Sequence, residues 1–226
     1  MEIPNVADKW SGGVNEITLG ATKDKGGSRT KTFTIGGAKS IPFMDFEGNP
    51  GQKPVVAMDV YDVPPEDWPE TLTRPFADVL HDPAQWARKC VEQYGADVIC
   101  LKLDGIHPDK GNKSAEQAAK TVKSILAAVG VPLIIWGCEH DEKDNEVMPK
   151  VSQAAKGERC LLGVVTQDSY KTLTQQIKRI VGRNIVYDIQ NKMGMRLPQY
   201  TIHKRLNDLS AVVGNGNNAY FIHRIS

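Results

Sequence analysis

Four apolar runs of strand length, each followed by a helical pattern, constrain the fold of this 226-residue chain more than any other feature. Strands that alternate with helices in this way pair in parallel through right-handed crossovers. The runs are apolar on both faces, which is typical of a sheet that is covered on both sides. The sequence therefore predicts an α/β fold of parallel βα repeats, with strands in residues 54–61, 97–103, 131–137 and 159–165.

The helices of these repeats carry start signals. Asp82 precedes a proline and is placed to cap the first helix, and Ser114 with Gln117 forms a capping box at the second. We expect the third helix to begin at Asp144 and a fourth near Ser169. A closed barrel of eight units needs roughly 200 residues after its first strand. The βα rhythm stops earlier, after residue 182, so we expect an incomplete, TIM-barrel-like fold.

Two further segments flank the repeats. Residues 15–37 hold two alternating runs around the turn signal KDKGGSR, which predicts an N-terminal β-hairpin. Residues 175–226 hold 8 Lys and Arg against 2 Asp and Glu, whereas residues 1–174 hold 20 against 25. We therefore divide the chain into a hairpin region (1–50), a βα-repeat domain (51–174) and a divergent basic segment (175–226) without a defined fold.

Several classes of protein are disfavoured by the sequence. No apolar run reaches the roughly 18 to 20 residues that a membrane-spanning helix needs, and the N-terminus lacks the regions of a secretory signal. The four cysteines show no C-x-x-C spacing, so we expect no iron–sulfur cluster bound by this chain. We expect a cytoplasmic protein with no membrane or nucleic-acid partner.

Polar side chains follow the strands at the edge where ligands bind in α/β folds. Asp59, Asp104, Cys138, Gln167 and Asp168 lie near the predicted carboxyl ends, and parallel pairing would bring them to one edge. Carboxylates there can act as acids, bases or hydrogen-bond acceptors for a cofactor. The alternative is that these residues cap helices or are solvated loop charges, and for a single residue this is the more common outcome.

Three motif-like patterns at this edge miss the spacing that their chemistry requires. Residues 105–114 resemble a phosphate-binding loop, but the spacing is one residue too long and Asn112 intervenes. Asp104 and His107 resemble the signature that supplies a histidine ligand to cobalt, again with the spacing wrong by one residue. His140 lies between two acidic residues, but adjacent loop residues seldom point at one metal ion, so we expect a solvated loop there.

The chain resembles a known family over about residues 13–174: the small (delta) subunit of the corrinoid iron–sulfur protein of the carbon monoxide dehydrogenase/acetyl-CoA synthase system. The resemblance is specific because its segments occur in order and with similar spacing. Past Thr174 the chain departs from the family pattern. The segments that carry the resemblance are EITLGATKDKGGSRTKTFTIGGAKSIPF, FEG, PVVAMDVYDVPPEDWPE, DPAQWARKCVEQYGADVICLKL, NKSAEQAAKTVK, VGVPLIIWGCEHDEKDNEV and CLLGVVTQDSYKTL.

The resemblance implies a TIM barrel that pairs with a large subunit, which carries the iron–sulfur cluster and holds most of the corrinoid. It implies a non-catalytic role, in which the barrel caps the methyl-bearing face of the cobalt. The heterodimer would meet a methyltransferase and acetyl-CoA synthase transiently, and carry a methyl group from methyltetrahydrofolate between them. The alternative from a different class is an enzyme: a folate-dependent corrinoid methyltransferase that acts on its own.

Overall fold

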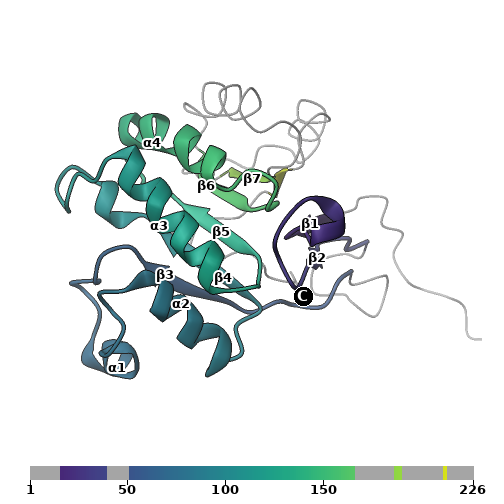
Figure 1. The fold of residues 1–226 in the computed structure, drawn as a ribbon, viewed down its shortest axis with the longest axis horizontal. Coiled ribbons are helices and arrows are strands. Elements are labelled where there is room, and N and C mark those ends of the chain that lie inside the picture. The colour runs from purple at the N-terminus through teal and green to yellow at the C-terminus, as the bar shows by residue number, and fades with distance from the viewer. Residues whose placement is uncertain (1–15, 40–50, 166–185, 190–210, 213–226) are drawn as a thin grey trace, which may run out of the picture.

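A parallel six-stranded sheet and a two-stranded antiparallel hairpin form the framework of the protein (Figure 1). The computed structural model describes residues 16–39, 51–165, 186–189 and 211–212. The sheet has the strand order β3-β4-β5-β6-β7-β8. The strands are β1 (Ile17–Leu19), β2 (Phe33–Ile35), β3 (Ala57–Tyr61), β4 (Val98–Lys102), β5 (Leu133–Trp136), β6 (Leu161–Val165), β7 (Val186–Ile189) and β8 (Ala211–Val212), and the helices are α1 (Glu70–Thr73), α2 (Pro83–Glu92), α3 (Ala115–Ala128) and α4 (Asp141–Ala154).

The predicted fold class is confirmed. Each of the four expected strands forms, the pairs β3–β4, β4–β5 and β5–β6 are parallel, and β1 pairs with β2 in an antiparallel hairpin. The sheet does not close among the described residues, which fits an incomplete barrel. The division into regions at residues 50 and 174 stays a prediction.

The sheet extends further than its sequence pattern indicates. An incomplete barrel predicts unpaired edge strands near residues 55–60 and 160–165. For the second strand the prediction is wrong, because β6 pairs in parallel with β7. Strand β7 in turn pairs with β8. The partner of a strand four residues long is set by contacts distant in sequence, which a local pattern does not contain.

Helix start signals explain where α2 and α3 begin. The Asp82 side chain accepts hydrogen bonds from the first turn of α2, and both halves of the capping box form between Ser114 and Gln117. The expected start of the third helix at Asp144 is wrong by one turn: α4 begins at Asp141, with His140 as its N-cap. Asp144 is instead buried and contacts the preceding loop.

Two hydrophobic clusters lie on opposite faces of the sheet. Side chains that alternate along β4 and β5, such as Ile99 and Ile135, pack under α2, α3 and α4. The intervening side chains, such as Val98 and Ile134, pack against Ile17 and the rest of the hairpin. The strands are therefore apolar on both faces because helices cover one face and the hairpin covers part of the other.

The hairpin is fastened to the amino ends of β5 and β6 by one buried arginine. Arg29 donates to the carbonyl oxygens of Leu126 and Val129, each at 2.6 Å, and to the Glu158 carboxylate at 2.8 Å. The guanidinium thus satisfies carbonyls at the carboxyl end of α3, which have no partner within the helix. The hairpin lies close to the loop between α3 and β5, since a Cβ on Gly130 would lie 2.3 Å from the Thr30 hydroxyl.

Among the described residues, no helix combines the length and the apolar character that a bilayer crossing requires.

Candidate functional site

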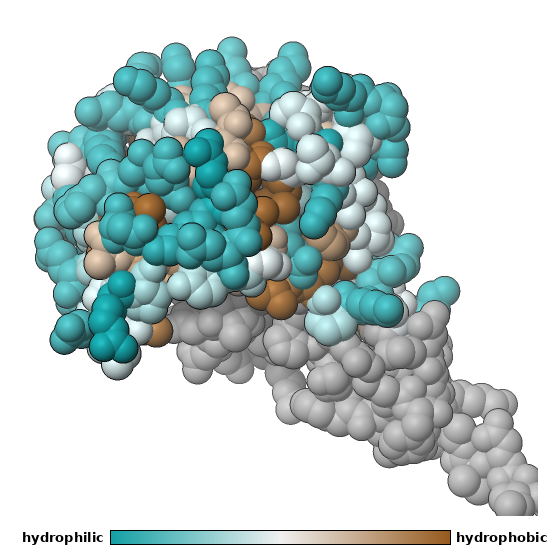
Figure 2. Space-filling model, turned by 60° about the horizontal axis from the view of Figure 1, so that its bottom comes forward, coloured by the Kyte–Doolittle hydropathy of each residue, from teal (hydrophilic) through white to brown (hydrophobic). Residues whose placement is uncertain are grey.

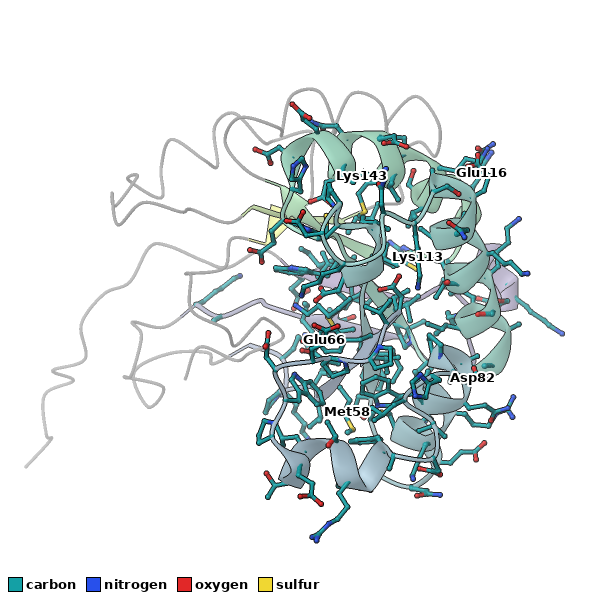
Figure 3. All side chains as sticks on the ribbon, turned by 90° about the vertical axis from the view of Figure 1, so that its left-hand side faces the viewer. Met58, Glu66, Asp82, Lys113, Glu116 and Lys143 are labelled. Atoms are coloured by element: carbon teal, nitrogen blue, oxygen red, sulfur yellow. The ribbon has the colours of Figure 1, made fainter. Side chains whose placement is uncertain are left out.

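The carboxyl ends of β3, β4 and β5 and the segments that follow them form the candidate site. Figure 3 shows this end of the sheet, where Glu66, Lys113 and Lys143 mark the segments that follow β3, β4 and β5. Since the strands are parallel neighbours, these segments lie at one edge, as the sequence predicts.

Asp62 joins the loop after β3 to the loop after β4. Its buried carboxylate accepts a hydrogen bond from the backbone N–H of Gly105 at 2.7 Å and one from Lys113 Nζ at 3.0 Å. Lys113 Nζ also donates to the Asp62 carbonyl oxygen at 2.6 Å. A Cβ at position 105 would lie 2.6 Å from the carboxylate, so glycine is required for this contact. The glycine and lysine of the phosphate-loop-like pattern therefore have a structural role.

Asp144, in the first turn of α4, holds the loop after β5 in place. Its carboxylate oxygens accept hydrogen bonds from the backbone N–H groups of Cys138 at 2.9 Å and Glu139 at 3.1 Å. A Cβ on Gly137 would lie 2.3 Å from Asp144 Oδ1, so this loop also needs glycine. Burial raises the pKa of the Asp144 carboxyl, while the backbone donors act in the opposite direction.

The predicted site residues have different environments. Asp59, which the sequence places near the carboxyl end of its strand, lies in the middle of β3, two residues before the strand end, with an exposed side chain. Asp104 forms an ion pair with Lys110 at 2.7 Å, and this hydrogen bond raises the pKa of the lysine. Burial raises the pKa of the Cys138 thiol to about 12, and the Asp144 carboxylate adds to the effect. Gln167 and Asp168 lie outside the described residues.

A lysine–tryptophan pair occupies the last row of the sheet. Lys102 and Trp136 are register partners, and Lys102 Nζ lies 4.2 Å from the centroid of the indole ring. Gly163 is the next residue in this row, and a Cβ there would lie 2.9 Å from the Trp136 ring. The glycine thus leaves room for the indole, which places an aromatic surface with a cation over it at the carboxyl end.

Two histidines from neighbouring loops meet at the same edge. The rings of His107 and His140 have centroids 5.6 Å apart and are nearly perpendicular. Each Nδ1 accepts a backbone hydrogen bond, His107 from Asp109 and His140 from Lys143. A neutral imidazole whose Nδ1 accepts carries its proton on Nε2, so both Nε2 atoms are hydrogen-bond donors. No three His, Cys, Asp or Glu side chains in the described part of the chain are grouped so as to hold a metal ion.

Asp62 is the main residue of this edge that the sequence reasoning missed. The available signal was an acidic residue directly after an apolar strand, with two prolines at positions 64 and 65. Its partner Gly105 is more than forty residues away in sequence, so the contact itself leaves no local pattern.

The sequence matches the family described as CO dehydrogenase/acetyl-CoA synthase delta subunit over residues 16–207. The chain belongs to this family. The resemblance noted above is therefore confirmed, and the family match continues past Thr174, where the segment resemblance ends.

Relatives of this delta family are named acetyl-CoA decarbonylase/synthase complex subunit delta. The subunit from Archaeoglobus fulgidus is 38% identical over 161 residues, which is 71% of this chain and 35% of the relative. The subunit from Methanothermobacter thermautotrophicus is 40% identical over 160 residues, 70% of this chain and 39% of the relative. The subunit from Methanocaldococcus jannaschii is 35% identical over 182 residues, which is 80% of this chain and 42% of the relative. The chain thus spans about two fifths of the length of these relatives.

Proposed function

We propose that this chain acts in the cytoplasm as the small subunit of a corrinoid iron–sulfur methyl carrier. In this role it covers a corrinoid that a large subunit holds, while a methyl group passes from methyltetrahydrofolate to acetyl-CoA synthase. The observation that carries the proposal is membership of the delta-subunit family over residues 16–207. The polar carboxyl edge of the sheet is the surface through which we expect it to act.

The side chains at this edge suit the periphery of a corrinoid, which carries primary amide groups. The exposed Asp59 carboxylate, two residues before the carboxyl end of β3, accepts hydrogen bonds of the kind that an amide N–H donates. The Nε2–H groups of His107 and His140 donate, as an amide carbonyl requires. The residues present therefore fit the cofactor as a set of hydrogen-bond partners, and the corrinoid supplies the cobalt that carries the methyl group.

The same edge favours a capping role over bond chemistry by this chain. Asp62 and Asp144 are buried and hold backbone N–H groups, and Asp104 is paired with Lys110. The Cys138 thiol, with a pKa of about 12, carries very little thiolate at neutral pH, and the thiolate is the nucleophilic form. The acidic groups that chemistry would need are mostly engaged in fixing loops.

We include Asp59, Asp104, Cys138, Gln167 and Asp168 in the proposed contact surface for the corrinoid. The proposed stable partner is the large subunit, with the methyltransferase and acetyl-CoA synthase as transient partners. No iron–sulfur cluster is assigned to this chain, because the large subunit would carry it.

The test is the assembly of this chain with a cognate, corrinoid-loaded large subunit, followed by size-exclusion chromatography with light scattering. We expect a one-to-one complex at micromolar concentrations, and weaker binding for Asp59→Ala. A matched control is Asp24→Ala, an exposed aspartate at the hairpin end of the molecule, which should bind like the unmodified chain. Absence of a complex, or equal binding by all three proteins, would contradict the proposal.

The enzyme alternative has a separate readout. The chain alone is mixed with methyltetrahydrofolate and free cob(I)alamin, and the cobalamin spectrum is followed. We expect no methyl transfer above the rate without protein. Turnover that depends on this chain would identify it as a methyltransferase in its own right.

A further inference from the structure

The loop between β4 and α3 is closed at its base. The Lys113 N–H donates to the Gly105 carbonyl oxygen at 2.9 Å, so the chain returns at residue 113 to the point that it left at residue 105. The far side of the loop is also close to this point, since a Cβ on Gly111 would lie 3.2 Å from the same carbonyl oxygen. Ile106 is fully buried in the core on the helix side of the sheet. Residues 105–113 therefore form a compact loop whose position depends on its base.

The Asp62 side chain lies at this base and binds both ends of the loop. Its carboxylate accepts hydrogen bonds from the Gly105 N–H at 2.7 Å and from Lys113 Nζ at 3.0 Å. Figure 2 shows a face of the molecule whose described part is covered mostly by hydrophilic side chains, whereas the Asp62 side chain is fully buried. A buried carboxylate is tolerated only where hydrogen bonds and an opposite charge compensate it. Asp62, on the segment after β3, thus holds the loop after β4 from outside that loop.

Hydrogen bonds inside the loop extend this constraint to His107. The His107 N–H donates to the Asp104 carbonyl oxygen at 3.1 Å, and the His107 carbonyl oxygen accepts from the N–H groups of Lys110 and Asn112, each at 3.0 Å. The Asp109 N–H donates to Nδ1 of the His107 ring at 3.1 Å. Both the backbone and the ring of His107 are therefore fixed relative to the base of the loop.

The His107 ring meets His140, which follows a loop that is held separately. The two ring centroids are 5.6 Å apart, and the ring planes are at 89°. Asp144 accepts from the N–H groups of Cys138 and Glu139, directly before His140. The relative position of the two rings thus depends on two buried carboxylates, one for each loop. Because each ring donates through Nε2, these carboxylates also set the spacing of the two donors.

We infer that Asp62 is a positioning residue: through the base of the 105–113 loop it holds the Nε2–H of His107 beside His140, as a donor to an amide carbonyl at the corrinoid periphery. The inference rests on the proposed function, because the corrinoid is the ligand that this donor would meet. Asp62 is buried, so it acts through His107 and does not contact the ligand. The Lys113 ammonium compensates the Asp62 charge at the base of the loop.

The variant Asp62→Asn separates positioning from a purely structural role. The amide keeps the shape of the side chain and an oxygen that can accept from the Gly105 N–H, but it loses the charge that Lys113 compensates. A purely structural loss would weaken binding to every form of the large subunit equally, whereas a loss of positioning acts on the corrinoid contact alone. The matched control is Asp97→Asn, because the Asp97 carboxylate accepts one backbone N–H, that of Val56 at 3.0 Å, just before β4 at the amino end of the sheet.

A second variant covers the case in which Asp62→Asn does not fold. Lys113→Met removes the ammonium and leaves the bond from the Gly105 N–H to Asp62 in place. Its control is Lys120→Met, an exposed change on α3. The results expected for Lys113→Met are those expected for Asp62→Asn.

NMR of the isolated chain measures the position of the two rings. The ring protons of His107 and His140 should give nuclear Overhauser effects in the unmodified chain, since the rings are in edge-to-face contact. Asp62→Asn should lose these effects, and Asp97→Asn should keep them. Their retention in Asp62→Asn would overturn the inference, because the loop would then hold His107 without the carboxylate.

Calorimetric titration of the large subunit, with and without its corrinoid, measures the consequence for binding. We expect the corrinoid to raise the affinity of the unmodified chain and of Asp97→Asn equally. For Asp62→Asn this gain should be smaller by about threefold to tenfold, the effect of one lost hydrogen bond. An unchanged gain in Asp62→Asn would overturn the inference. Absence of binding by the unmodified chain would instead contradict the proposed function, and the NMR measurement would still decide whether Asp62 holds His107.

Discussion

The two ends of the parallel sheet are held in different ways. At the amino end, Arg29 joins the hairpin, the end of α3 and Glu158 through one buried guanidinium. At the carboxyl end, Asp62 and Asp144 each fix a loop next to a strand by accepting backbone N–H groups. The amino end is therefore closed by one buried guanidinium that joins the hairpin to a helix end and to Glu158, whereas at the carboxyl end two buried aspartates hold loops in place. Together with the proposed function, this difference leads us to treat the amino end as the stabilising end and to propose the carboxyl end as the binding end.

The largest effect should come from breaking the amino end. Arg29→Ala leaves carbonyls of Leu126 and Val129 without their donor and Glu158 without its buried partner. Breaking a buried pair in this way costs about 3–5 kcal/mol, so we expect a loss of that size in the free energy of unfolding, measured with urea. Lys23→Ala, an exposed change in the same hairpin region, is the control. A loss below about 1 kcal/mol for Arg29→Ala would show that the hairpin does not depend on it.

Removing the Asp144 carboxylate at the carboxyl end of the sheet should lower the free energy of unfolding by less than Arg29→Ala does. Asp144→Ala leaves the N–H groups of Cys138 and Glu139 without their acceptor. The variant loses two hydrogen bonds to the carboxylate and leaves two N–H donors unsatisfied. We therefore expect a loss of about 2–3 kcal/mol in the free energy of unfolding. Glu142→Ala, an exposed change in the first turn of the same helix, should remain within about 0.5 kcal/mol. Equal losses for the two variants would contradict the role assigned to Asp144.

The pH dependence of stability sharpens the same comparison. The pKa of Asp144 is raised in the folded protein, so the folded state holds this proton more tightly than the unfolded state. The stabilisation by this group is complete below its unfolded pKa of 3.8 and decreases as the pH rises through its folded pKa. Each unit of elevation corresponds to about 1.4 kcal/mol. The difference in free energy of unfolding between the unmodified chain and Asp144→Asn should therefore fall as the pH rises, and a rise would contradict the assignment.

A structural feature of this protein is predictable from the sequence when the residues that form it lie close together along the chain. The capping box at Ser114 and Gln117 was predictable because its partners are three residues apart. The four strands were predictable from composition and length. The sequence predicts Asp144 as a helix start because acidic residues are common there, whereas its burial depends on the space left by Gly137.

The features that were missed depend on contacts between distant residues. The bond from Gly105 to Asp62 joins two loops, and the pairing of β6 with β7 depends on where a later segment lies. The candidate site was predictable as an edge because parallel strands bring their carboxyl ends together. Which side chains there are engaged and which remain exposed was visible only in the structure.

The most direct test of the stabilising-end and binding-end account is a calorimetric titration of corrinoid-loaded large subunit with Asp59→Ala. The variant removes an exposed carboxylate in the middle of β3, so its stability should remain within about 0.5 kcal/mol of the unmodified chain. The account predicts that its affinity for the loaded large subunit falls several-fold, while Asp24→Ala at the hairpin end retains full affinity. Undiminished affinity of Asp59→Ala, with weaker binding by Asp24→Ala, would place the binding surface at the amino end and contradict the account.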